Sequence, residues 1–235
     1  MGENHSAAWE SQLRQGVVAL GFGRGDLPAL GEGRIQALVR YVNLLQQWGA
    51  AYNLSAVKAP SDIVTLHLLD CLAVVGPLRH QLNLPAAMEP ARLLDVGSGA
   101  GLPGIVLALA LPEVRVTSVD AVAKKVAFMR QAGAQLGLSN FQALHTRVED
   151  LKDHWTVITS RAFSSLDDFV RLTRPLLDRG GVWMAMKGKP DPGEIEALEP
   201  SLHSRVEALT VPGLDASRCL VWLHPEEPAP PPATQ

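Results

Sequence analysis

An acidic residue followed by alternating glycines stands near the middle of the 235-residue chain, in the segment Asp95-Val96-Gly97-Ser98-Gly99-Ala100-Gly101. An apolar run leads into this segment, and a helix-like run leaves it. Glycines allow backbone dihedrals and a close ligand approach that side chains would block. This strand–loop–helix pattern is typical of a turn that binds a nucleotide-like cofactor.

The glycines fit two cofactor patterns. Residues 99–104 match the GxGxxG fingerprint of dinucleotide-binding proteins, which is weak evidence on its own. A second frame fits better, because Asp95 ends the first apolar run, the glycines follow it, and Asp120 ends the next apolar run. This arrangement resembles motif I of the Rossmann-like methyltransferases, whose cofactor is S-adenosylmethionine.

The chemistry of that cofactor suits these residues. S-adenosylmethionine has an ammonium group, a carboxylate and a sulfonium, and Asp95 can place negative charge near the ammonium or brace the loop. Backbone N–H groups of the loop are expected to bind the carboxylate. Asp120 is placed to accept hydrogen bonds from both ribose hydroxyls, although an acid also occupies this position in nicotinamide sites.

The elements that position these residues follow from the apolar pattern. From Arg92 onward short apolar runs alternate with helical stretches, including a helix near Leu166 to Leu177, which predicts an α/β fold with a doubly wound, mostly parallel sheet. Two final strands are expected at Arg205–Val211 and Arg218–His224. The short segment between them favours an antiparallel last strand.

The chain before this region reads as helical. An apolar stripe from Ile35 to Trp48 predicts an amphipathic helix, whose end is marked by Gly49 and the YNL (52–54) that follows. Gly76-Pro77 and the stretch around Leu84-Pro85 are expected to form a linker. We therefore expect a helical extension over residues 1–80, a cofactor-binding core over 81–224 and a Pro-rich tail over 225–235.

Composition narrows the class of protein. No continuous apolar run reaches the length of a membrane span, and the polar N-terminus lacks the features of a signal peptide. Cys71 and Cys219 are too few and too far apart to suggest a disulfide framework or a metal cluster. We expect a cytoplasmic monomer that uses no metal and contacts no membrane.

The net charge of −3 hides an uneven distribution. Residues 121–189 contain eleven Lys or Arg against six Asp or Glu, whereas residues 190–235 contain two against eight. A basic segment is often only a solvated face, but this one also suits a nucleic-acid partner.

Several further motifs carry a resemblance to one family. The chain resembles the bacterial small-subunit ribosomal RNA guanine-N7 methyltransferases, the RsmG or glucose-inhibited division protein B family, from about Leu38 to Leu223. The motifs that carry it are WGAAYNLSAV (48–57), His67-x-x-Asp70, LLDVGSGAGLPGI (93–105), Asp120 followed by Lys124-Lys125, TRVEDL (146–151), SRAFSSL (160–166) and AMKGK (185–189).

The resemblance implies a class I, Rossmann-like methyltransferase that methylates N7 of one guanine in the 530 loop of 16S rRNA. Its partner would be 16S rRNA or the small ribosomal subunit. Carried over by motif, the cofactor contacts fall on Gly97, Leu102, Val148, Glu149 and Arg161, beside the loop residues Asp95, Ser98, Gly99, Gly101 and the ribose acid Asp120. The family's usual Asp-Ser is Asp120-Ala121 here, so one hydroxyl is absent, and its YNLT is YNLS.

Guanine N7 carries a free lone pair and no proton, so its methylation needs no general base, and we expect catalysis by positioning. The candidate contacts to RNA or base are Asn53, Ser55, Arg147, Phe163 and Lys187. Structural roles are favoured over catalytic dyads for His145 with Glu149 and for His67 with Asp70.

Three alternatives stay open at this point. They are a small-molecule methyltransferase, a ribosome-binding protein that has kept a vestigial cofactor fold, and a nicotinamide-dependent oxidoreductase.

Overall fold

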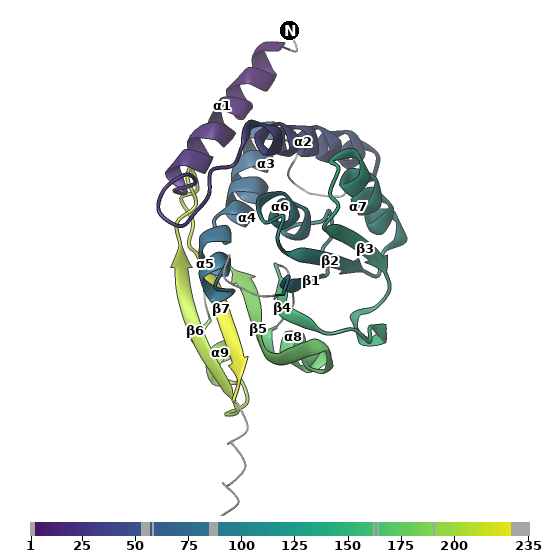
Figure 1. Ribbon diagram of the computed structural model, residues 1–235, viewed down its shortest axis with the longest axis vertical. Coiled ribbons are helices and arrows are strands. Elements are labelled where there is room, and N and C mark those ends of the chain that lie inside the picture. The colour runs from purple at the N-terminus through teal and green to yellow at the C-terminus, as the bar shows by residue number, and fades with distance from the viewer. Residues whose placement is uncertain are drawn as a thin grey trace, which may run out of the picture.

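A computed structural model describes residues 3–52, 57, 59–84, 89–161, 163, 165–189 and 191–226. The described chain forms three layers, with helices on both faces of one twisted sheet (Figure 1). The predictions for Asn53, Ser55 and residues 227–235 of the tail lie outside these residues.

The sheet has seven strands in the described part of the chain, in the order β3-β2-β1-β4-β5-β7-β6. Strands β1 to β5 are parallel, and β7 runs antiparallel to both β5 and β6. The strands are β1 Arg92–Val96, β2 Arg115–Asp120, β3 Phe141–His145, β4 Trp155–Ser160, β5 Leu177–Lys187, β6 Leu202–Leu209 and β7 Arg218–Pro225. The predicted doubly wound sheet with an antiparallel last strand is confirmed.

Successive apolar residues of the central strands point to opposite faces of the sheet. Leu93 of β1 and Met184 of β5 belong to one buried cluster, whereas their neighbours Leu94 and Trp183 belong to the other. Both faces are buried, so these strands read in sequence as continuous apolar runs.

Two sets of helices cover these faces (Figure 1). The larger cluster receives α1 Glu3–Ala19, α2 Glu32–Tyr52, α3 Pro60–Ile63, the π-helix η1 Val64–Leu69, α4 Asp70–Leu72, α5 Val75–Gln81, α6 Gly104–Ala110 and α7 Ala123–Gln135. The smaller cluster receives η2 Val148–Asp150, α8 Leu166–Thr173, η3 Arg174–Leu176 and α9 Pro192–Glu196.

Helix α2 ends at Tyr52, within the segment expected to mark its end. The expected linker at Gly76-Pro77 was wrong, because these residues lie within the first turn of α5. Proline is tolerated there because the N–H groups of a first turn have no intrahelical acceptor.

Element ends differ elsewhere as well. The helix expected to reach Leu177 tightens to a 3₁₀ turn at Arg174-Pro175, and Leu177 already belongs to β5. Strand β6 begins and ends a few residues earlier than expected, and the short helix α9 was not predicted. These ends depend on pairing partners that local sequence does not identify.

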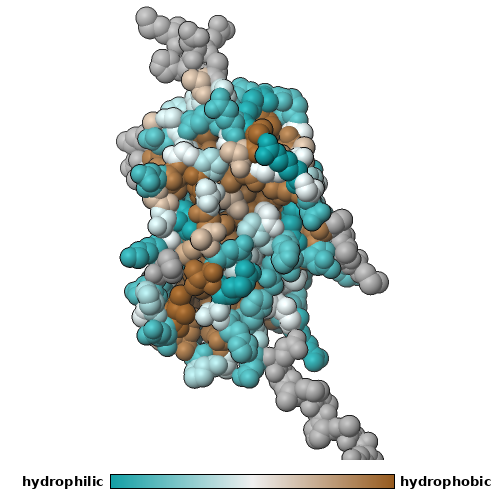
Figure 2. All heavy atoms as spheres, turned by 90° about the vertical axis from the view of Figure 1, so that its left-hand side faces the viewer, coloured by the Kyte–Doolittle hydropathy of each residue, from teal (hydrophilic) through white to brown (hydrophobic). Residues whose placement is uncertain are grey.

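The helical run Pro60–Gln81 is long and apolar enough to cross a membrane by composition alone, yet 61% of its most apolar window is buried inside the protein. It packs as a core helix. The side of the molecule that carries α1 and β6 shows apolar side chains between polar ones (Figure 2). Within the described ranges, no three or more His, Cys, Asp or Glu side chains gather as a metal-binding group.

Candidate functional site

The loop between β1 and α6 requires its glycines. Gly97, Gly99 and Gly101 have φ angles of +68°, +59° and +84°, a region that other residues rarely occupy. At Gly101 space is also limiting, because an added Cβ would lie 2.5 Å from Cδ1 of Ile105. The alternating glycines therefore set the path of the loop.

Five backbone N–H groups of this loop, those of Gly97, Ser98, Gly99, Gly101 and Leu102, are engaged within the protein, and the binding of a ligand carboxylate by the loop stays a prediction. The N–H groups of Gly97 and Ser98 donate to the carbonyl oxygen of Val119 at 2.9 and 3.2 Å, and those of Gly101 and Leu102 donate to the carbonyl of Ser98. The N–H of Gly99 donates to Asp120 Oδ2 at 3.0 Å. Loop N–H groups shape the site in this structure.

Asp95 is completely buried beneath the loop. Its Oδ2 accepts hydrogen bonds from the N–H of Gly104 at 3.0 Å and the hydroxyl of Ser118 at 3.1 Å, while its Oδ1 has no partner. Burial raises the pKa of this carboxyl to about 6, against the lowering effect of the hydrogen bonds. Of the two roles considered for Asp95, the contacts match bracing of the loop and of the first turn of α6.

Asp120 lies at the end of β2 with 8% of its surface exposed. Its Oδ2 accepts from Gly99 and its Oδ1 from the N–H of Val122 at 2.9 Å, and Lys125 Nζ is 3.5 Å from Oδ2. A carboxylate has about four lone-pair sites, so both oxygens keep acceptor capacity for hydroxyl groups.

Two side chains that support the loop were missed by the sequence analysis. The hydroxyl of Tyr41 in α2 donates to the carbonyl of Ala100 at 2.5 Å, in a fully buried position. Ser118 lies opposite Asp95 in the register of β1 and β2. No local sequence pattern predicts either contact. The contact of Ser118 with Asp95 can be predicted once the register of β1 and β2 is known.

A cavity of about 270 Å³ opens at the carboxyl ends of β1, β2 and β3, beside the point where the strand order reverses between β1 and β4. Ligands in open α/β sheets bind at such a point. Six predicted residues line this cofactor cavity, namely Gly97, Asp120, Arg147, Val148, Glu149 and Phe163. The fold thus gathers residues that are up to 66 positions apart in the sequence.

Within this set, Phe163 also packs on the core, with its ring 5.4 Å from that of Phe169. Arg147 and Glu149 are exposed. His145 does not build a dyad with Glu149 in the described structure, since its Nε2 lies 3.2 Å from the carbonyl oxygen of Ala121. This contact is consistent with the structural role expected for His145, which stays a prediction.

Arg161 lies outside the cofactor cavity, against the π-helix. Its Nη1 is 3.3 Å from the carbonyl of Leu66 and from Nδ1 of His67, and 3.7 Å from Asp70 Oδ2. Asp70 Oδ1 also accepts from Arg218 Nε at 2.9 Å. Burial raises the pKa of Asp70 and the two arginines oppose that rise, while burial and Arg161 lower the pKa of His67.

Lys187, at the end of β5, is paired with Glu194 of α9 at 2.8 Å. Two basic side chains of α7 are engaged as well: Lys125 approaches Asp120, and Arg130 Nε donates to the carbonyl of Ala143 at 3.0 Å. Lys124 is exposed. Exposed cations on this face are therefore fewer than the sequence suggests.

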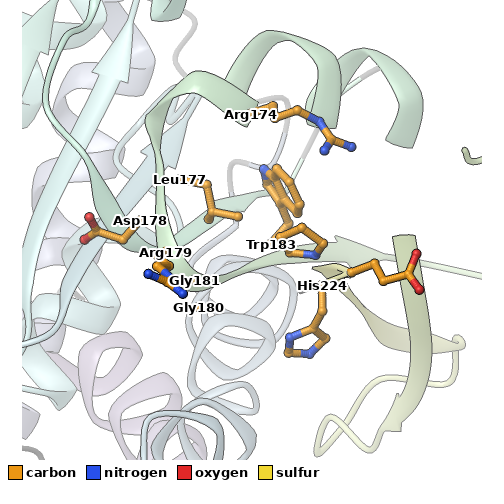
Figure 3. Close-up of a pocket in the computed structure, with 10 residues that line it drawn as sticks. Arg174, Leu177, Asp178, Arg179, Gly180, Gly181, Trp183 and His224 are labelled. Carbon is orange, nitrogen blue, oxygen red and sulfur yellow. The ribbon is translucent and has the colours of Figure 1, made fainter. Parts of the chain in front are cut away.

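Another cavity of about 370 Å³ lies at the opposite edge of the sheet, where β5 begins and β7 ends. Arg174, Arg179, Trp183 and His224 surround it (Figure 3). It contains none of the residues that the motifs indicated, and acidic and basic side chains balance there. We therefore assign the candidate site to the carboxyl ends of strands β1, β2 and β3.

The family model described as GidB, rRNA small subunit methyltransferase G, matches residues 34–221. The chain is 51% identical over 90% of its length to ribosomal RNA small subunit methyltransferase G of Methylibium petroleiphilum, covering 92% of that protein. It is 50% identical over 92% of its length to the protein of the same name from Leptothrix cholodnii, covering 96% of it.

Among solved structures, magnesium protoporphyrin IX methyltransferase from Synechocystis PCC 6803 with bound SAM superposes with a TM-score of 0.55. The match covers 78% of this chain and 97% of that one at 12% identity. This similarity shows a shared fold.

Proposed function

The chain belongs to the rRNA small subunit methyltransferase G family, and from this membership we propose that it methylates N7 of one guanine in the 530 loop of 16S rRNA. It is an rRNA methyltransferase that uses S-adenosylmethionine. The match of the family model to residues 34–221 carries this conclusion. We further propose that it acts as a monomer in the cytoplasm, where small subunits are assembled.

The cofactor cavity fits S-adenosylmethionine in its donor set. Apolar walls from Val96, Val119 and Val148 suit an adenine ring, and Asp120 keeps acceptor capacity for ribose hydroxyls. No atom lies within 4 Å of the position that a Cβ on Gly97 would take, so space above the loop is open. We propose Gly97, Asp120, Val148 and Glu149 as cofactor contacts.

When bound, the cofactor supplies an electrophilic methyl group on a cationic sulfur. The role of the chain is to hold acceptor and donor in line and to exclude water, because the lone pair of N7 is already available. Asp95, Ser118 and Tyr41 keep the loop in place from below. No general base is required, which is consistent with the structural contacts of His145.

A methylation assay with the purified protein tests the proposal. The protein is incubated with S-adenosylmethionine carrying a labelled methyl group and with either protein-free 16S rRNA or small subunits that lack 7-methylguanosine. Mass spectrometry of nuclease fragments should then show one new 7-methylguanosine in the 530 loop. Absence of methyl transfer to both substrates, or methylation at another atom, would contradict the proposal.

Two further measurements separate the alternatives. S-adenosylmethionine should raise the melting temperature of the protein, and NAD should not. A nicotinamide-dependent enzyme would show the reverse. A strain lacking the gene should lose one 7-methylguanosine from its 16S rRNA; an unchanged rRNA map would favour a small-molecule substrate or a non-catalytic role.

A further inference from the structure

A second cavity, of about 300 Å³, lies on the same edge of the sheet as the cofactor cavity and shares no lining residue with it. Arg161 enters it from the end of β4, Lys187 from the end of β5 and Arg218 from the start of β7. Because Lys187 pairs with Cys219 in the β5–β7 register, its strand position is next to that of Arg218. Three cationic side chains thus converge from three strand ends.

Among the described residues that line this basic cavity, Asp70 of α4 is the one acidic residue. It is 4% exposed and lies between the two arginines, 2.9 Å from Arg218 Nε and 3.7 Å from Arg161 Nη1. Asp70 balances one of the three cationic charges and Glu194 balances that of Lys187, so one positive charge, shared by the two arginines, stays unbalanced. Glu194, which pairs with Lys187, approaches from outside the lining.

Both guanidinium groups keep unused donors. Arg218 uses Nε for Asp70 and Nη1 for the carbonyl of Ser217, and Arg161 uses Nη1 for Leu66 and His67. Each guanidinium has five N–H donors, so Nη2 of both side chains is available. Their side chains are 24% and 26% exposed, which leaves them accessible from the cavity.

Such a cavity suits an anion and disfavours the reacting base. Guanine becomes positively charged when N7 is methylated, and the unbalanced charge of the arginine pair would oppose that charge. A phosphate, in contrast, matches paired guanidinium groups in charge and in hydrogen-bonding geometry. The base must therefore lie outside the basic cavity.

We propose that the basic cavity is a phosphate subsite that holds the backbone of the substrate RNA next to the target guanine, with Arg218 as its principal ligand. Asp70 is a positioning residue that orients Arg218 and Arg161. This inference rests on the proposed function, because it assumes an RNA substrate. The cofactor carboxylate is the other anion at this edge, so the test must separate the two sources.

The Arg218→Gln variant removes the charge at the centre of the cavity, and Arg218→Lys keeps it without the guanidinium fork. The matched control is Arg179→Gln, which removes the same charge from an exposed position at the opposite edge. For each protein we would measure the dissociation constant of protein-free 16S rRNA at several salt concentrations, the affinity for S-adenosylhomocysteine, and the melting temperature.

We expect Arg218→Gln to weaken rRNA binding about tenfold and to reduce the salt slope by about one. Arg218→Lys should keep the slope, and Arg179→Gln should change neither quantity. Affinity for S-adenosylhomocysteine should stay within about twofold in all of them. If Arg218→Gln lowers the melting temperature, the Arg218→Lys protein still tests the guanidinium contact. This variant should retain the salt slope of rRNA binding but bind rRNA less tightly.

Two results would overturn the phosphate subsite. If Arg218→Gln loses affinity for S-adenosylhomocysteine and binds rRNA unchanged, the basic cavity binds the carboxylate of the cofactor. If both affinities are unchanged, the basic cavity binds neither the cofactor nor the RNA backbone. Failure of the proposed function is recognised separately, because the unmodified protein would then not methylate rRNA.

Discussion

Asp120 has two tasks at the level of the single residue. Its carboxylate anchors the glycine loop through the N–H of Gly99 and the following turn through the N–H of Val122. The same oxygens are the proposed ribose acceptors. A single side chain thereby links the shape of the loop to cofactor binding.

Replacing Asp120 by alanine should therefore reduce affinity for S-adenosylhomocysteine by at least about tenfold, since hydrogen bonds to a charged group contribute about 1.5 to 3 kcal/mol. Isothermal titration calorimetry measures this directly. Asp120→Asn, which keeps one acceptor oxygen, should give an intermediate affinity. Unchanged affinity in the alanine variant would show that the ribose assignment is wrong.

Asp95 is a second residue with a measurable signature. Its pKa of about 6 in the folded protein lies above the ordinary value of 3.8, so the folded state keeps a proton that the unfolded chain releases. Stability should fall as pH rises from about 4 to about 6, by up to about 3 kcal/mol. Asp95→Asn should gain stability relative to the unmodified protein between pH 4 and pH 7 in urea unfolding. A constant difference between the two proteins across this range would refute the buried-carboxyl explanation.

At the level of elements, the β1–α6 loop is held from several directions. Asp95 supports it from β1, Asp120 from β2 and Tyr41 from α2. Glycine is the residue that adopts this path with the least strain at the positions of positive φ. Loop geometry is therefore a joint product of local sequence and packing.

Gly101→Ala should disturb the loop more than backbone strain alone explains. Gly101 and Gly137 have φ angles of +84° and +69°, but an added Cβ meets Ile105 only at Gly101 and finds open space at Gly137. Both alanine variants should lose about 1 kcal/mol from backbone strain, and only Gly101→Ala should lose more and bind S-adenosylhomocysteine less tightly. Thermal melting and calorimetry distinguish them; equal effects would mean that Ile105 yields without cost.

At the scale of the whole molecule, the N-terminal helices and the sheet share one buried cluster. Leu13, Leu38 and Leu68 belong to the same cluster as Ile105 and Trp222. The division into an extension over residues 1–80 and a core over 81–224 stays a prediction, and α5 extends to Gln81, across the proposed boundary. We infer that the helices of residues 1–80 complete the hydrophobic core on one face of the sheet.

A chain that begins at residue 81 should accordingly fail to fold. Without the first 80 residues, the apolar faces of α6 and α7 that α2 covers would be exposed to water. Circular dichroism should show no cooperative melting transition, and S-adenosylmethionine should give no thermal shift. A cooperative transition with cofactor binding would show instead that residues 81–226 are an independent domain.

The sequence predicted the fold class, the succession of strands and helices along the chain, and most of the residues that line the cofactor cavity. The alternating glycines and the acids after two strands are local patterns, and six of the predicted residues line one cavity. Element ends such as those at Gly76 and Leu177 were misjudged, because helices and strands end where tertiary contacts stop supporting them.

The sequence by itself indicated the candidate cofactor loop, since positive φ angles favour glycine and an acid ends each of two successive apolar runs. Only the tertiary structure decided what the other charged residues do. It placed Asp70 between Arg161 and Arg218, which lies 148 positions away from Asp70, and it engaged Lys187 with Glu194. Charge pairs of this kind depend on distances in space, and no local pattern of residues encodes them.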